Sequence, residues 1–77
     1  MRTYPGAAQT IRIQMVRCGY TLDRLSEDTG VSKEILRGIL AGRTQSISVR
    51  TICAVSQVFG YSAAEFMDLI SQAPTDP

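Results

Sequence analysis

The stretch from Thr21 to Gly42, TLDRLSEDTGVSKEILRGILAG, constrains the fold of this chain more than any other segment. It contains two short helical patterns, and a hydroxyl side chain precedes each of them, Thr21 the first and Ser32 the second. Such a side chain can accept a hydrogen bond from the free amides at the start of a helix. Gly30 lies between the patterns, where glycine can adopt the positive φ of a sharp reversal. The sequence therefore predicts two helices joined by a tight turn.

Helical periodicity extends on both sides of this pair, and no strand pattern or repeat is present. The first helix is expected from Ala7 to Cys18, with the inward stripe Ala8, Ile11, Met15 and Cys18. Ser48 is expected to cap a fourth helix, with the inward set Val49, Ile52, Val55, Ser56 and Phe59. Ser62 and Glu65 form a capping box that starts a fifth. We predict an N-terminal arm over residues 1–6, an all-α domain of five helices over 7–70, and a flexible tail over 71–77.

Length and composition limit the classes of fold and site that the chain can form. A chain of 77 residues forms one domain with a thin core, since about 60% of the surface of so short a chain is buried on folding. Two cysteines without a secretory leader favour small core residues over a disulfide, and the absence of histidine argues against a zinc site. Neither a leader nor an apolar run of membrane-spanning length is present. We expect a cytoplasmic protein without a metal or cofactor.

The distribution of charge is more informative than its net value of +1. Up to Arg50 the chain has eight basic and four acidic residues, and from Thr51 onward it has three acidic residues and no basic one. This asymmetry fits a molecule with one end facing phosphates, although randomly scattered surface charge is the alternative. The two helices joined by a tight turn lie in this basic part of the chain. Together they form the helix-turn-helix arrangement that typically presents a helix to DNA.

Four segments of the chain resemble one family: Ile11–Arg12, Gly19–Ser32, Ile35–Arg43 and Ser46–Phe66. In residues and spacing they are similar to the phage-repressor and Cro-like helix-turn-helix family, which includes controller proteins of restriction–modification systems. The resemblance covers most of the chain. It implies a compact lambda-repressor-like domain that binds double-stranded operator DNA as a homodimer, with the helix from Ser32 to Ala41 in the major groove.

The resemblance also implies roles for individual residues. Base contacts would come from Ser32, Lys33, Glu34 and Arg37, although Glu34 could equally be an exposed partner of the helix dipole. Phosphate contacts would come from Thr21, Arg43, Thr44, Gln45 and Ser46. The fifth helix has more apolar surface than one buried face needs, so we expect the dimer interface at Phe66, Met67, Leu69 and Ile70.

Some positions depart from the family pattern. Leu22 stands where many members have a glutamine that binds phosphate. Met15 and Leu40 replace an arginine–glutamate pair, and we predict that they pack on each other. Gly38 lies inside a helix at a cost of about 1 kcal/mol relative to alanine. Close approach of DNA, a neutral surface position and a tight helix crossing are the three explanations for it.

For a DNA-binding regulator, we expect repression of the bound promoter. A second hypothesis remains open beside it. The same fold could serve as a protein-interaction module, such as an antitoxin-like or anti-regulator subunit without DNA binding, because fold alone does not determine function. An enzyme is not expected, since no nucleophile-and-base pattern or glycine-rich phosphate loop is present. Nor is a small-molecule ligand expected.

Overall fold

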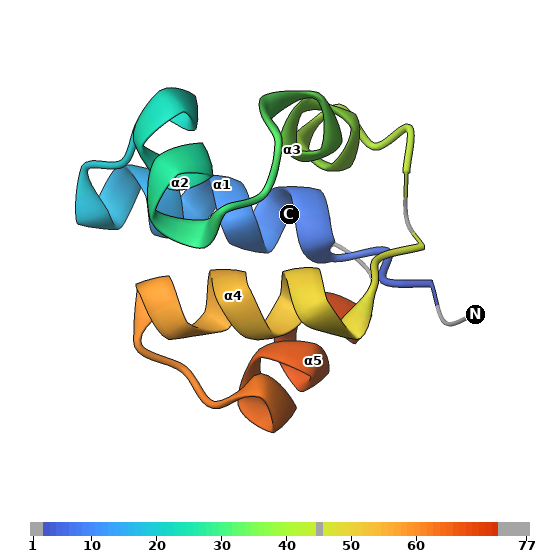
Figure 1. The fold of residues 1–77 in the computed structure, drawn as a ribbon. Helices are drawn as coiled ribbons and strands as arrows, with labels where there is room; N and C mark the ends of the chain where they lie inside the picture. The colour runs from blue at the N-terminus through green and yellow to red at the C-terminus, as the bar shows by residue number, and fades with distance from the viewer. Residues whose placement is uncertain (1–2, 45, 73–77) are drawn as a thin grey trace.

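Five helices make up the chain in the computed structural model, which describes residues 3–44 and 46–72. They are α1 (Ala7–Cys18), α2 (Leu22–Thr29), α3 (Lys33–Leu40), α4 (Val49–Phe59) and α5 (Ala63–Ser71). In Figure 1, α2 and α3 form the upper part of the molecule, and α4 and α5 form the lower part. The all-α prediction of five helices is confirmed, and the first helix has the predicted bounds.

The helix starts are set by local hydrogen bonds, as the sequence predicts. Thr21, Ser32 and Ser48 each accept a hydrogen bond from the backbone amide three residues later, at 3.2, 3.3 and 3.2 Å. Ser62 and Glu65 form the reciprocal capping box at the start of α5, with both bonds at 3.1 Å. These contacts satisfy amides that a helix leaves free at its N-terminus.

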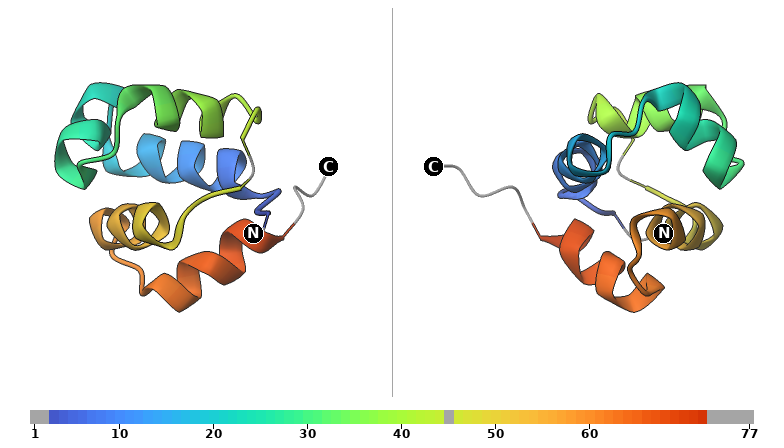
Figure 2. Two further views of the ribbon diagram at one scale, coloured as in Figure 1. Left: turned by 45° about the vertical axis from the view of Figure 1, so that its right-hand side comes forward. Right: turned by 90° about the vertical axis from the view of Figure 1, so that its left-hand side faces the viewer.

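The core lies between the α2–α3 pair and the α4–α5 pair and takes residues from all five helices. α1 packs against α3 and α5, α2 against α3 and α4, and α4 against α5, an arrangement that can be followed in Figure 2. The fully buried side chains include Ile11, Leu25, Leu36, Ile39, Ile52, Val55, Phe66 and Ile70. Leu25 and Leu36 anchor α2 and α3 to this core, so the central helix pair has a fixed orientation. Within the described residues, none of the helices combines the length and the apolar character needed to cross a membrane.

Two predicted inward faces are corrected. In α1 the buried residues are Ala7, Ile11 and Gln14, and Cys18 is exposed because it lies at the end of the helix, beyond this face. Gln14 tolerates burial because its Nε2 donates to the hydroxyl of Tyr61 at 3.1 Å. In α4 the buried face begins at Ile52, and Val49, at the first position of the helix, is 61% exposed.

The N-terminal segment is part of the domain, which corrects the predicted arm from residue 3 onward. Thr3 forms an isolated antiparallel bridge with Ser46, and the ring of Tyr4 is buried in the core. The amide of Gly6 donates to the carbonyl of Ile70 at 2.8 Å. This contact joins the start of α1 to the last turn of α5, which continues to Ser71. The rest of the predicted tail, residues 73–77, lies outside the described residues.

Candidate nucleic-acid interface

The turn between α2 and α3 is held by hydrogen bonds over residues 25–31. Gly30 ends α2 with φ of 74°, and its amide donates to the carbonyl of Ser26 at 2.9 Å. The hydroxyl of Ser26 donates to the carbonyl of Val31 at 2.6 Å. The amide of Val31 donates to the hydroxyl of Thr29 at 3.2 Å, and this hydroxyl donates to the carbonyl of Leu25. A side chain at position 30 would be strained at this φ, so glycine sets the angle between the helices.

α3 has one buried face and one exposed face. Its side chains Leu36 and Ile39 lie in the core. The four residues predicted to contact bases are all exposed and lie in the first two turns of the helix or at its cap: Ser32, Lys33, Glu34 and Arg37. Ile35 is also exposed, at 51%, but a separation of two residues turns it away from Lys33 and Arg37 around the helix. The structure thus leaves all four predicted residues exposed along α3, and it also exposes an apolar side chain, Ile35, in the first turn.

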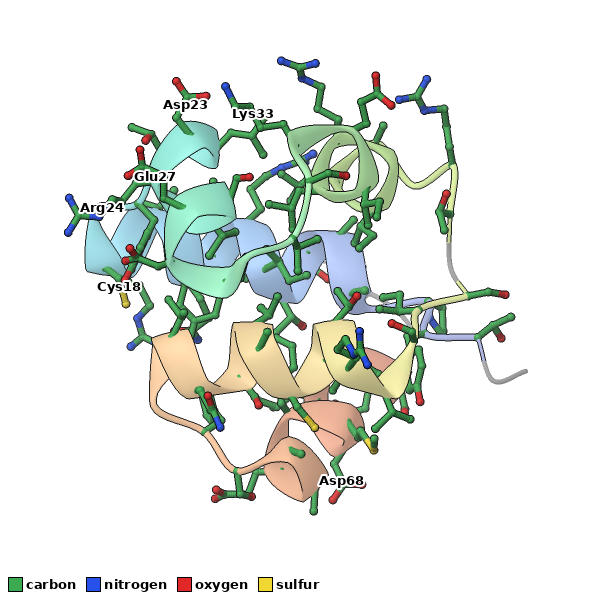
Figure 3. All side chains as sticks on the ribbon, in the orientation of Figure 1. Cys18, Asp23, Arg24, Glu27, Lys33 and Asp68 are labelled. Atoms are coloured by element: carbon green, nitrogen blue, oxygen red, sulfur yellow. The ribbon has the colours of Figure 1, made fainter. Side chains whose placement is uncertain are left out.

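An ion pair connects this face of α3 to the first turn of α2. The ammonium nitrogen of Lys33 lies 3.1 Å from Oδ1 of Asp23. Figure 3 shows the two side chains on the same side of the molecule, with Asp68 at the opposite end. Both partners are exposed, so the pair adds little to the stability of the fold. Its consequence is electrostatic, because a carboxylate lies beside the lysine that is expected to face DNA.

The loop after α3 is fastened to that helix at Gly38. The carbonyl of Gly38 accepts hydrogen bonds from the amides of Arg43 and Thr44 at 3.0 and 3.2 Å. Gly38 is buried, and a Cβ added to it would lie 3.2 Å from the hydroxyl oxygen of Thr44. Burial rules out a neutral surface position, and the atoms nearest to an added Cβ belong to Thr44 and not to another helix. The close approach that the structure shows is made by the chain's own loop, and close approach of DNA stays a prediction.

The residues predicted to contact phosphate lie on two segments, the start of α2 and the loop after α3. Arg43 and Thr44 are exposed on the fastened loop, and Ser46 is exposed where it pairs with Thr3. Gln45 lies outside the described residues. Thr21 is exposed at the start of α2, while Leu22 is half-buried and packs against the core. Leu22 therefore contributes to packing and has no polar group to offer to a phosphate.

A hydrogen bond joins α1 to the end of α3. Nη2 of Arg12 donates to the carbonyl of Leu40 at 2.8 Å. A cation here also complements the partial negative charge at a helix C-terminus. Met15 and Leu40, the apolar replacements for the family's charge pair, both pack against the core. Their predicted contact with each other stays a prediction.

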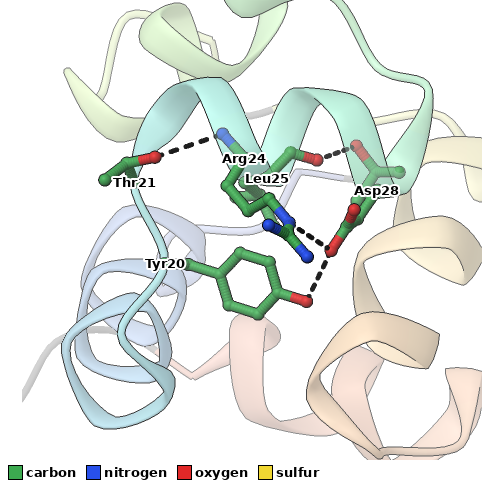
Figure 4. A network of polar contacts seen from close by, with 6 residues as sticks. Tyr20, Thr21, Arg24, Leu25 and Asp28 are labelled. Carbon is green, nitrogen blue, oxygen red and sulfur yellow. Dashed lines mark hydrogen bonds and ion pairs between the residues drawn. The ribbon is translucent and has the colours of Figure 1, made fainter.

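A second group of polar contacts joins α2 to Tyr20 in the segment that precedes it (Figure 4). The hydroxyl of Tyr20 donates to Oδ2 of Asp28 at 2.8 Å, and Nε of Arg24 lies 3.4 Å from the same oxygen. The hydrogen bond to Asp28 raises the pKa of the Tyr20 hydroxyl, and burial adds to the effect. The ring of Tyr20 meets that of Phe59 edge-on, with centroids 5.8 Å apart. These contacts tie α2 to α4 and leave its N-terminus exposed.

The predicted dimer surface is reduced by half. Phe66 and Ile70 are fully buried within the single chain and are not available to a second copy, because they close the core between α1, α4 and α5. Met67 is half-buried, and Leu69 is 36% exposed. The extra apolar surface of α5 therefore serves mainly the core of the monomer.

Comparison with known proteins places this geometry in a family. A solved structure described as the SinR protein/SinI protein complex is similar to the chain, with 29% sequence identity and a TM-score of 0.74. The similarity covers 80% of this chain and 60% of the other, so the chain spans less than two thirds of that protein's length. No curated protein matches the chain. The family described as helix-turn-helix matches residues 11–66. The match spans most of the chain, which therefore belongs to the Cro-like helix-turn-helix family that its sequence resembles.

Proposed function

We propose that this protein is a sequence-specific transcriptional regulator that binds a palindromic operator as a homodimer, with α3 in the major groove. Membership of the helix-turn-helix family supports a DNA-binding regulator and not an enzyme. The observation that carries the proposal is the division of α3 into two faces. One face is buried in the core, and the other exposes Ser32, Lys33, Glu34 and Arg37.

The chemistry of the exposed face suits the major groove. Arg37 and Lys33 can donate to O6 and N7 of guanine, and Glu34 can accept from the amino group of cytosine. The groove admits an α-helix, and each base pair presents a distinct set of donors and acceptors there. Three charged side chains of two signs on one short helix can therefore distinguish one base sequence from another.

Contacts to the phosphates would set the position of the helix in the groove. Free amides at the N-terminus of α2, next to Thr21, favour an anion. Arg43, Thr44 and Ser46 extend the same surface beyond the end of α3, and Gln45 belongs to this set from the sequence alone. Since Leu22 packs against the core, Arg43 and its loop would supply much of the anchoring. Such contacts fix register and depend strongly on salt.

The homodimer rests on a smaller surface than the sequence predicted. Leu69, with Met67 beside the core, is the part of α5 that a second copy could cover. A two-fold axis would place two copies of α3 about 34 Å apart, one turn of DNA, on two equivalent half-sites. We propose repression as the outcome, with occupancy set by protein concentration because dimerisation depends on it.

The test is selection of bound fragments from random double-stranded DNA, followed by mobility-shift titrations at several salt concentrations. The unaltered protein should bind a two-fold symmetric sequence, and its affinity should fall steeply with salt. Arg37→Ala should weaken binding by about 1–3 kcal/mol per half-site and relax the base preference. Arg17→Ala is the matched control, because Arg17 is also an exposed arginine in the last turn of a helix. Absence of a salt-sensitive shift with the unaltered protein contradicts the proposal.

A protein-interaction module is the second candidate, and two observations favour it. The similar solved structure is described as a complex of two proteins. In this chain, the pairing of Lys33 with Asp23 also lowers the positive potential of the exposed face. If the selection yields no DNA while a protein partner binds the α2–α3 face, loss of that partner on Arg37→Ala would support this second function.

A further inference from the structure

Ile35 is the one large apolar side chain exposed on the described face of α3. The other exposed large hydrophobic residues of the described chain lie on α1, α4 and α5: Ile13, Val16, Val49 and Leu69. A single exposed isoleucine is common on protein surfaces and requires no explanation by itself. The position of Ile35 does, because it lies in the first turn of α3, the helix that is proposed to lie in the major groove.

The sequence neighbours of Ile35 are mainly polar and carry charges of both signs. Lys33 and Glu34 precede it in the same turn, and Gly38 follows it one turn later on the same side of the helix. Since Gly38 has no side chain and Thr44 is held against it, the loop brings a threonine close to this part of α3. The apolar surface is limited to one side chain, which is too small for a stable protein interface.

One chemical group in the major groove fits such a side chain. Thymine presents a C5-methyl group there, which is the one methyl group among the four bases. We infer that Ile35 packs against the C5-methyl of a thymine in each half-site and makes the protein prefer thymine at that position. This inference rests on the proposed binding of operator DNA and adds a specificity-determining residue to it. Lys33, Glu34 and Arg37 supply the polar readout, and Ile35 supplies the apolar readout.

The experiment removes the methyl group from the DNA and the side chain from the protein. In the selected operator, each thymine is replaced in turn by deoxyuridine, which keeps the base pair and loses only the methyl. Affinities are measured by fluorescence anisotropy at constant salt for the unaltered protein and for Ile35→Ala. For the unaltered protein, one position should lose about fourfold in affinity per half-site, the value expected for one buried methyl group.

Combining the loss of the thymine methyl with Ile35→Ala identifies the contact between them. Ile35→Ala should bind the original operator more weakly and should not distinguish thymine from deoxyuridine at the position that the unaltered protein reads. Ile13→Ala is the matched control, because Ile13 is 47% exposed and lies on α1, outside the α2–α3 face. It should keep both the affinity and the full response to the missing methyl.

The outcomes separate the inference from the proposed function. If the operator is bound and no thymine responds, or if Ile35→Ala keeps the response, the inference is wrong while the DNA-binding function stands. If selection yields no salt-sensitive binding to any double-stranded DNA, the proposed function fails and the inference fails with it. A response that is lost in Ile35→Ala and kept in Ile13→Ala supports both.

Discussion

Replacing Gly38 with alanine tests how the loop that follows α3 is positioned. Gly38 has a helical backbone, so alanine should be favoured there by about 0.8–1.0 kcal/mol from its helix propensity alone. The added Cβ would lie 3.2 Å from the hydroxyl oxygen of Thr44, which is closer than ordinary van der Waals contact. Thr44 would have to leave its preferred rotamer, at a cost of about 0.5–1.5 kcal/mol. The two effects nearly cancel, and we expect the free energy of unfolding to change by less than about 0.5 kcal/mol.

A second background separates the two effects. Thr44→Ala removes the hydroxyl and leaves the Cβ of residue 44, which would lie 3.8 Å from the new Cβ, an ordinary contact. In that background, Gly38→Ala should raise the free energy of unfolding by the full ~0.8–1.0 kcal/mol. The coupling energy between the two positions should therefore be about 0.5 kcal/mol or more, as for residues in direct contact.

Urea denaturation of the four proteins, followed by circular dichroism, measures this cycle. The two single variants, the double variant and the unaltered protein complete it. A gain of about 1 kcal/mol for Gly38→Ala in the unaltered background would refute the reasoning, because the propensity term would then be unopposed. So would a loss in the Thr44→Ala background, since the obstacle would then be something other than the Thr44 hydroxyl.

Three further predictions follow from particular contacts. Asp23→Asn should raise the affinity for DNA, because it frees Lys33 and removes a carboxylate near the phosphates; anisotropy at two salt concentrations measures this, and an unchanged affinity would contradict it. Hydrogen bonds from the backbone and hydroxyl of Ser62 lower the pKa of the Glu65 carboxyl below its ordinary value of 4.5. The ionised carboxylate therefore stabilises the folded state above pH 4.5, and this contribution is lost as pH falls through the lower folded-state pKa. Glu65→Gln should therefore melt with less dependence on pH in this acidic range, measured as Tm against pH by circular dichroism. Leu69→Glu should shift the protein to monomers in sedimentation experiments at unchanged helix content, whereas an unaltered protein that is already monomeric at all concentrations would rule out the proposed homodimer.

The candidate site could be predicted from the sequence as a set of exposed residues and not as a set of contacts. The period of α3 places Leu36 and Ile39 inward, which leaves Lys33, Glu34 and Arg37 on the outer face. The partners of these residues come from other elements. The pairing of Lys33 with Asp23 follows from the angle between α2 and α3, which no local pattern specifies.

The helices and their limits follow from local interactions, which can be recognised in the amino-acid sequence. A cap such as Ser62 acts within three residues, and Gly30 needs only its own φ, so both can be recognised before the fold is known. The apolar period likewise belongs to one helix at a time. For these reasons the five helices and the central turn were predicted with nearly correct bounds.

Roles that depend on partners distant in the sequence became visible in the folded chain alone. Gln14 is buried because the hydroxyl of Tyr61, 47 residues away, satisfies its amide. Tyr4 enters the core from a segment without periodicity, and Phe66 and Ile70 are buried by α1 and α4, so half of the expected dimer surface is interior. Burial of such groups depends on which segments meet in space, and that is settled by the packing of the whole chain.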